Sequence, residues 1–158
     1  MGRLAGTQKG TQIMEKIKVM KLRSGAILPT YGSAESAGAD LYACLENAVT
    51  IAPGETVFIP TGLSMELPVG YVGLIYARSG MACKRGLAPA NKVGVIDSDY
   101  RGEYIVALHN HGDQPQKIAH GERIAQLVIT PVFTPGFCEV DSLSQTLRGQ
   151  GGFGSTGK

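Results

Sequence analysis

Apolar and polar residues alternate over short stretches along most of this chain, a pattern typical of half-buried β-strands. The clearest stretch, residues 17–22, alternates except that the apolar Met20 follows Val19. Other short apolar or alternating runs are residues 40–45, 56–59, 63–67, 71–76, 103–108 and 123–132. Turn-forming dipeptides and tripeptides separate these runs, such as Pro53-Gly54, Pro68-Val69-Gly70 and Pro135-Gly136. Many short strands at this spacing predict an all-β sandwich or jelly-roll barrel.

One short helix is expected among the strands. Residues 79–84 contain good helix formers, Ser79 is a candidate N-cap, and Gly86 is a natural stop. No internal repeat or linker divides the chain, so residues 14–140 are predicted to form one domain. Residues 141–158 are predicted to be a flexible arm, and the patternless residues 1–13 a disordered extension or a cloning remnant outside the fold.

Composition narrows the class of protein. The 158 residues can build one real core. A net charge of +2 is too mild to indicate a nucleic-acid polymer as partner. No apolar run is long enough to span a membrane, and no secretory signal is apparent. Three widely spaced cysteines predict neither a disulfide framework nor a zinc site, and they suit a reducing, cytoplasmic location.

The C-terminal segment has the most distinctive chemistry. It reads Arg148-Gly149-Gln150-Gly151-Gly152-Phe153-Gly154-Ser155-Thr156-Gly157-Lys158. A guanidinium, exposed backbone N–H groups and hydroxyls suit a polyphosphate, and an aromatic ring suits a flat base. The segment is therefore interpreted as an arm that closes over a nucleotide. A flexible tail without a role is the alternative on this segment alone.

Four polar islands interrupt the strands. They are Ser36-Ala37-Gly38-Ala39-Asp40-Leu41, Ala77-Arg78-Ser79-Gly80, Gly94-Val95-Ile96-Asp97-Ser98-Asp99-Tyr100-Arg101-Gly102-Glu103 and Gly121-Glu122-Arg123-Ile124-Ala125-Gln126-Leu127. The second opens the expected helix, where N–H groups bind anions. In the third, Asp97 follows an apolar run expected to be buried, and in the fourth a strand amide, Gln126, needs partners. Each also has a plain structural interpretation: a turn aspartate, a helix cap, a hairpin turn or a loop anchor.

Taken together, the four islands and the C-terminal segment resemble the five motifs of the trimeric dUTPases, in the family's order and from about residue 16 to the C-terminus. The second motif often begins with Pro in that family, and Ala77 stands there instead. The resemblance implies a jelly-roll homotrimer that hydrolyses dUTP to dUMP and pyrophosphate. It also implies Mg²⁺ as cofactor and a C-terminal arm exchanged between subunits, so that each site draws on three chains.

The resemblance further implies roles for individual residues. Asp97 would hold the attacking water, and Asp40 would support the phosphate–metal region indirectly, through water or Arg78. Tyr100 would pack on deoxyribose and exclude a ribose, and a hairpin over Asn91, Gly94 and Val95 would read uracil. The remaining substrate contacts would be Arg78, Ser79, Gly80, Gln126, Arg148, Phe153, Gly154, Ser155 and Thr156.

Two other functions share this scaffold. A dCTP deaminase has the same jelly-roll ancestry, but it would carry a catalytic glutamate near the pyrimidine and would lack the Gly-Phe-Gly-Ser-Thr arm. A jelly-roll binding or assembly protein would need neither Asp97 nor a closing arm. Hydrolysis of dUTP is therefore the leading hypothesis.

Overall fold

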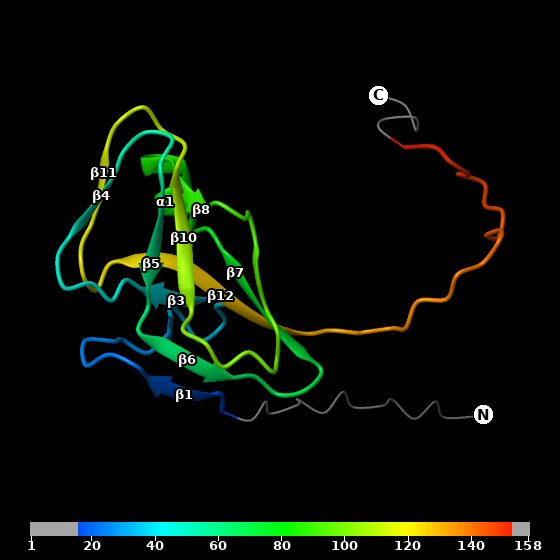
Figure 1. Ribbon diagram of the computed structural model, residues 1–158, viewed down its shortest axis with the longest axis horizontal. Helices are drawn as coiled ribbons and strands as arrows, with labels where there is room; N and C mark the ends of the chain where they lie inside the picture. Colours follow the sequence, from blue (N-terminus) through cyan, green and yellow to red (C-terminus); the bar gives the residue numbers. More distant parts are fainter. Residues whose placement is uncertain (1–15, 153–158) are drawn as a thin grey trace, which may run out of the picture.

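Short antiparallel strands make up nearly all of the regular structure (Figure 1). The computed structural model describes residues 16–152. The strands are β1 (Lys18–Lys21), β2 (Thr30–Tyr31), β3 (Ala39–Tyr42), β4 (Val49–Ile51), β5 (Thr56–Pro60), β6 (Leu63–Glu66), β7 (Tyr71–Tyr76), β8 (Leu87–Pro89), β9 (Gly94–Ile96), β10 (Ile105–Asn110), β11 (Gln116–Ile118) and β12 (Arg123–Pro131). The helix is α1 (Ser79–Arg85). The prediction of a β protein with one short helix is confirmed.

The strand runs expected from alternation are present, with ends shifted by a few residues. Five short strands were not expected: β2, β4, β8, β9 and β11. Each has only two or three residues, too few for alternation to be visible in the sequence. Pairing with other strands, which the sequence does not display, makes them strands: β2, β8 and β9 pair with longer neighbours, and β4 and β11 pair with each other.

The largest sheet has the order β2-β3-β12-β7-β9, and smaller sheets pair β5-β10-β8, β1-β6 and β11-β4. Neighbours that are distant in sequence, such as β3 and β12, show that the chain crosses over between strands, which is compatible with the expected jelly roll. Fully buried apolar side chains from several sheets meet in one core, including Leu41, Ile59, Leu108 and Ile124. Burial of these groups is the main force that holds the sheets together.

Strand register brings the polar islands together. In the largest sheet, Gln126 on β12 lies opposite Asp40 on β3 and opposite Tyr76 on β7. The chain leaves β7 at Tyr76 and enters α1 within three residues, so Arg78 and Ser79 emerge beside Gln126. Three islands that are far apart in sequence therefore share one end of this sheet.

The helix ends as expected but begins differently. Gly86 is its C-cap, with φ of 65°, and its N–H bonds the carbonyls of Met81 and Ala82. The N-cap is Arg78 in extended conformation, without a side-chain cap, so the assignment of Ser79 as N-cap was wrong. Ser79 is instead the first helical residue, and its hydroxyl remains available to the site.

Candidate active site

A polar cavity of about 420 Å³ opens where three of the islands meet. Its lining residues are Gly32, Ser36, Ala37, Gly38, Asp40, Arg78, Ser79, Gly80, Arg123 and Gln126. The structure therefore brings together Asp40, Arg78, Ser79, Gly80 and Gln126, all of which were expected to bind or support a triphosphate. This cavity is the strongest candidate for a phosphate site.

Asp40 organises the charge in this cavity. Its Oδ1 accepts a hydrogen bond from Arg78 Nε at 2.6 Å, and its Oδ2 accepts one from Arg123 Nη1 at 3.3 Å. Asp40 lies within β3 and is buried, so it is not the turn aspartate of the plain structural interpretation. Two guanidiniums share one carboxylate, which leaves an excess positive charge facing the cavity. Such an excess favours an anionic ligand.

Gln126 lines the cavity and also anchors the loop that leads into α1. Its Nε2 donates to the carbonyl of Ala77 at 2.9 Å, which ties β12 to the entrance of α1. A Cβ atom on Gly38 would lie 2.5 Å from Gln126 Oε1, so only glycine leaves space for the amide here. The amide thus anchors the loop and also lines the cavity, which joins two interpretations that the sequence left as alternatives.

The backbone at the start of α1 supplies further donors. The first N–H groups of a helix have no intrahelical carbonyl to bond. Ser79 and Gly80 are exposed, and nothing lies within 4 Å of the position that a Cβ on Gly80 would take. An oxygen atom of a phosphate can therefore approach this backbone closely.

A second group of expected residues does not line this cavity. Asn91, Gly94, Val95, Asp97 and Tyr100 lie on the connection from β8 through β9 to the loop before β10. The single chain therefore does not bring the expected base and the expected phosphate ligands into one pocket.

The segment expected to read uracil forms a tight turn rather than the expected hairpin. The Lys92 N–H bonds the Pro89 carbonyl at 3.0 Å, and Lys92 has a left-handed φ of 66°. The flanking strands do not pair with each other, because β8 pairs with β10 while β9 pairs with β7. As a result β9 is an edge strand with one unpaired side, and its backbone groups can pair with a ligand.

The apolar run before Asp97 is only partly buried: Gly94 is buried and Ile96 packs against the core, but Val95 is not. Val95 is 62% exposed, and Asp97 and Tyr100 are exposed as well. The Tyr100 hydroxyl donates to the carbonyl of Glu103 at 3.2 Å, and the Tyr100 ring lies 6.1 Å from that of Tyr104. An edge strand on one side and an open loop on the other explain the exposure.

The third group lies on the C-terminal segment. Beyond β12 the chain leaves the body in an extended path (Figure 1). Arg148 is exposed, and its Nε donates to the carbonyl of Gly151 at 2.8 Å. Phe153, Gly154, Ser155 and Thr156 lie outside the described residues. Arg148 is therefore not in contact with the phosphate cavity of its own chain.

Arg123 is a site residue to which sequence reasoning assigned no role. A register shift in the pairing of β12 with β3 falls between Arg123 and Ala125. This irregularity lets Arg123 reach Asp40 from the same strand that presents Gln126 to the cavity. A strict two-residue period would place residues three apart on opposite faces, so the sequence pattern alone points away from Arg123.

The described residues contain no cluster of three or more His, Cys, Asp or Glu side chains placed to hold a metal ion. His109 and His111 stack edge to face with ring centroids 4.3 Å apart, and His109 Nδ1 bonds the Thr56 hydroxyl at 2.8 Å. Burial and the neighbouring His109 lower the pKa of His111 below its ordinary value. This pair lies outside the phosphate cavity.

Comparison with known proteins gives one consistent family. A family model described as dUTPase matches residues 24–157. A deoxyuridine 5'-triphosphate nucleotidohydrolase of Desulfitobacterium hafniense is 52% identical over 145 residues, which cover 90% of this chain and 96% of that protein. One of the same name from Syntrophotalea carbinolica is 47% identical over 141 residues, covering 89% of this chain and 96% of that protein.

Solved structures agree with the sequence comparisons. The dUTPase of Staphylococcus bacteriophage 80alpha with dUpNHpp superimposes with a TM-score of 0.85 at 29% sequence identity, covering 92% of this chain and 100% of that chain. The dUTPase from phage phi11 of S. aureus gives a TM-score of 0.75 at 25% identity, with 83% of this chain and 99% of that chain covered.

Proposed function

This chain belongs to the dUTPase family, and from that membership we propose that it hydrolyses dUTP to dUMP and pyrophosphate. The observation that carries the proposal is the cavity in which Asp40, Arg78, Ser79, Gly80 and Gln126 converge, set within a chain that matches the family over most of its length. The reaction would keep uracil out of DNA and would supply dUMP for thymidylate synthesis.

The cavity suits the triphosphate. Arg78 and Arg123 provide positive charge, Ser79 a hydroxyl and the start of α1 backbone N–H groups. The amide of Gln126 faces the same space. Hydrogen bonds from charged donors to phosphate oxygens are stronger than neutral ones, so this wall holds the substrate by its phosphates.

Asp97 is the proposed general base. Water attacks the α-phosphorus, a new O–P bond forms, and the bond from the α-phosphorus to the bridging oxygen breaks as pyrophosphate leaves. Asp97 orients the water and accepts its proton. Asp97 is exposed in the single chain, where a substrate can reach it.

Selectivity for dUTP is assigned to the segment around Asp97. The open edge of β9 and the turn before it offer backbone donors and acceptors to uracil, from Asn91, Gly94 and Val95. A cytosine would leave buried groups unpaired, at a cost of about 1–3 kcal/mol per group. Tyr100 stacks on deoxyribose, where a ribose 2′-hydroxyl would clash.

Mg²⁺ is the proposed cofactor. Both carboxylate oxygens of Asp40 already accept hydrogen bonds from guanidiniums, so the donor set suits an indirect role for Asp40 rather than direct ligation. The ion would be held by triphosphate oxygens and water, an arrangement that Mg²⁺ prefers. When bound, it neutralises charge that develops on the phosphate oxygens.

A homotrimer with exchanged arms would explain why the three groups of site residues lie apart from one another within a single chain. In that assembly the phosphate cavity of one subunit would meet the Asp97 loop of a second and the arm of a third. Arg148 and Ser155 with Thr156 would bind the γ-phosphate, and Phe153 with Gly154 would cover uracil.

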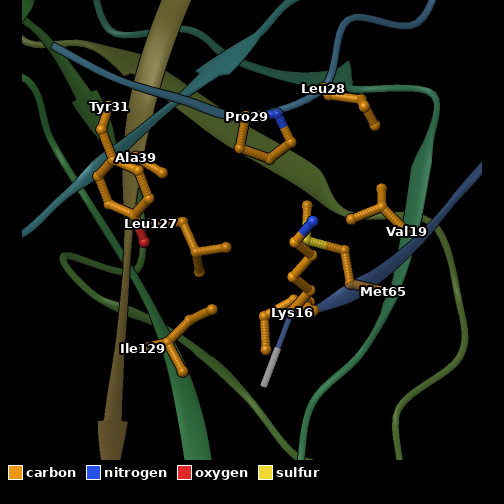
Figure 2. A pocket seen from close by; sticks show the side chains of 10 residues that line it. Lys16, Val19, Leu28, Pro29, Tyr31, Ala39, Met65, Leu127 and Ile129 are labelled. Atoms are coloured by element: carbon orange, nitrogen blue, oxygen red, sulfur yellow. The ribbon is translucent and has the colours of Figure 1, made fainter. Parts of the chain in front are cut away.

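Unburied apolar surface supports assembly. Residues 132–147 carry Phe133, Phe137, Leu143 and Leu147, each at least 85% exposed. An apolar groove of about 430 Å³ opens beside β1 and β12, and Figure 2 shows Val19, Leu28, Met65 and Leu127 around it. Surfaces of this kind in a small protein indicate contact with another chain. By contrast, Ile75 of β7 packs in the chain's own core, so its side of that strand is closed to another subunit.

No helix among residues 16–152 is long and apolar enough to cross a membrane. Cys44, Cys83 and Cys138 are all unpaired, which supports the proposed cytoplasmic location because thiols stay reduced there. The binding partners that follow from the proposed activity and the proposed trimer are the nucleotide and two further copies of the chain. A nucleic-acid polymer is not among them.

The activity is tested by measuring pyrophosphate release from dUTP, UTP, dTTP and dCTP in parallel, with and without Mg²⁺. Rapid release from dUTP alone, dependent on Mg²⁺, is the expected result. Comparable turnover of UTP would contradict the role of Tyr100. Release of ammonia from dCTP would instead indicate a deaminase.

A further inference from the structure

The loop that carries Asp97 and Tyr100 has no regular pairing of its own. It runs from the end of β9 to the start of β10. Hydrogen bonds within the loop fix its shape, but they do not fix its position on the rest of the protein. Arg101 Nη1 donates to the carbonyls of Ser98 and Tyr100, and the Tyr100 N–H donates to the Asp97 carbonyl. A catalytic loop of this kind needs anchors on the body of the protein.

The anchors lie at the far end of the loop. Ser64 on β6 donates to the Arg101 carbonyl at 2.7 Å, and Thr61 Oγ1 donates to the Tyr104 carbonyl at 2.6 Å. Glu103 supplies the charged anchor. Its Oε1 accepts from the Gly62 N–H at 2.8 Å, so the turn between β5 and β6 holds it from one side.

Arg23 holds the same carboxylate from the other side. Arg23 Nε donates to Oε1 at 3.0 Å and Nη2 donates to Oε2 at 3.1 Å, the paired geometry in which a guanidinium and a carboxylate fix each other's orientation. The Glu103 side chain is only 17% exposed. The hydrogen bond with Glu103 raises the pKa of Arg23 above its ordinary value.

The bidentate pair joins segments that are distant in sequence. Arg23 follows β1, where the Leu22 N–H also bonds the Gly62 carbonyl at 2.7 Å. Neither Arg23 nor Glu103 lines the phosphate cavity. Any effect of the pair on the site therefore passes through the loop that carries Asp97 and Tyr100, and not through the phosphate cavity.

We propose that Arg23 and Glu103 form a clamp that positions the Asp97–Tyr100 loop for catalysis and for rejection of ribonucleotides. Both are positioning residues, since they act through the loop. The proposal rests on the proposed function, because the loop's role in the reaction comes from it. A displacement of about 1 Å in a reacting group can lower a rate by roughly 10²-fold, so loss of one partner is expected to be visible in turnover.

The test compares Arg23→Met, Glu103→Gln, the double variant and Arg23→Lys. Lys18→Met is the matched control, because Lys18 forms the other ion pair of this region, with Glu66 at 2.9 Å, and does not touch the loop. The readouts are kcat and KM for dUTP and UTP well below the melting temperature, the melting temperature itself, and amide hydrogen exchange.

Each single variant is expected to lower kcat for dUTP by about 10-fold and to narrow the ratio of dUTP to UTP turnover, with little change in KM. The double variant should lose no more than the worse single variant, because one clamp is removed in each case. Arg23→Lys should recover part of the loss, and Lys18→Met should behave as wild type.

Hydrogen exchange tests the clamp without relying on the reaction. Amides of residues 98–104 should exchange several-fold faster in Glu103→Gln, while those of β7 should not change. A lowered melting temperature with unchanged kcat, substrate ratio and loop exchange would overturn the clamp. Absence of dUTP cleavage by the wild-type protein would overturn the proposed function instead, and loop exchange would still decide whether the clamp exists.

Discussion

At the scale of single residues, the proposed chemistry depends on Asp97. Asp97→Asn keeps the shape of the side chain but cannot accept a proton, so kcat for dUTP is expected to fall by roughly 10²–10⁴-fold. Affinity for a non-hydrolysable dUTP analogue should change far less, because the phosphate and uracil contacts remain. Turnover and titration calorimetry measure the two effects.

Asp99 offers the matched control. It is a second exposed carboxylate on the same loop, two positions along the chain. Asp99→Asn should leave kcat within a few-fold of wild type. Equal losses at Asp97 and Asp99 would indicate a general effect of loop charge and would remove the assignment of the base.

Tyr104 shows how one buried atom affects stability. The residue is fully buried, its hydroxyl has no partner within the described chain, and burial raises its pKa to about 12. Removing an unpaired buried hydroxyl relieves a desolvation penalty, so Tyr104→Phe should be neutral or more stable, by up to about 1–3 kcal/mol. Urea unfolding at neutral pH measures this.

The same residue predicts a dependence on alkaline pH. A phenol whose pKa is about 12 in the folded state and about 10 in the unfolded chain is protonated in both states below pH ~10, so stability does not depend on its ionisation there. Stability falls as pH rises from ~10 toward ~12, because the unfolded chain releases the phenol proton while burial keeps it bound in the folded state. Tyr104→Phe should therefore lose less stability than wild type between these pH values, and identical alkaline profiles would contradict the shift.

At the scale of elements, the site combines rigid and open parts. The phosphate cavity is built on β3, β12 and the start of α1, whose alignment is set by strand register. The segment proposed to read uracil includes the edge strand β9, and the proposed arm extends beyond β12, the last strand that the structure describes. A rigid wall can hold the phosphates while the open elements adapt to the nucleotide.

Deletion of residues 149–158 tests the arm. The remaining chain keeps every strand found among residues 16–152, so it should fold and assemble, but activity should be very low because closure over the substrate is lost. Phe153→Ala should be intermediate, since a stacking contact worth about 1–3 kcal/mol is removed while the phosphate contacts stay. Steady-state kinetics and circular dichroism are the measurements, and full activity without the arm would refute the lid.

At the scale of the whole molecule, the separation of the phosphate cavity from Asp97 predicts that activity requires assembly. Light scattering should give a trimer, and an active stable monomer would refute this. Mixed assemblies provide a sharper test. Asp97→Asn and the arm-deleted chain, each nearly inactive, should regain activity when co-refolded.

The expected recovery follows from symmetry. In a random 1:1 mixture, a site that takes its loop and its arm from different subunits receives an intact copy of both with a frequency of about one quarter. Activity near one quarter of wild type is therefore expected. If the loop and the arm of one site came from the same chain, the mixture would stay inactive.

The sequence by itself determined the class of fold and the identity of the motifs. Alternating runs predicted the longer strands because a two-residue period reflects burial of one sheet face, and Gly86 predicted the helix end because a left-handed cap favours glycine. The sequence also marked Asp40 and Gln126 as candidate site residues, because polar side chains are unusual inside strands. It marked Arg78 and the C-terminal segment because their donors suit phosphate.

Only the tertiary structure decided which of these residues meet. The opposition of Asp40 and Gln126, and the reach of Arg123 to Asp40 across a register shift, depend on pairing between strands distant in sequence. The exposure of Val95 likewise follows from its place on an edge strand. Local periodicity carries no information about partners or edges, because both arise from contacts that the chain makes only once it is folded.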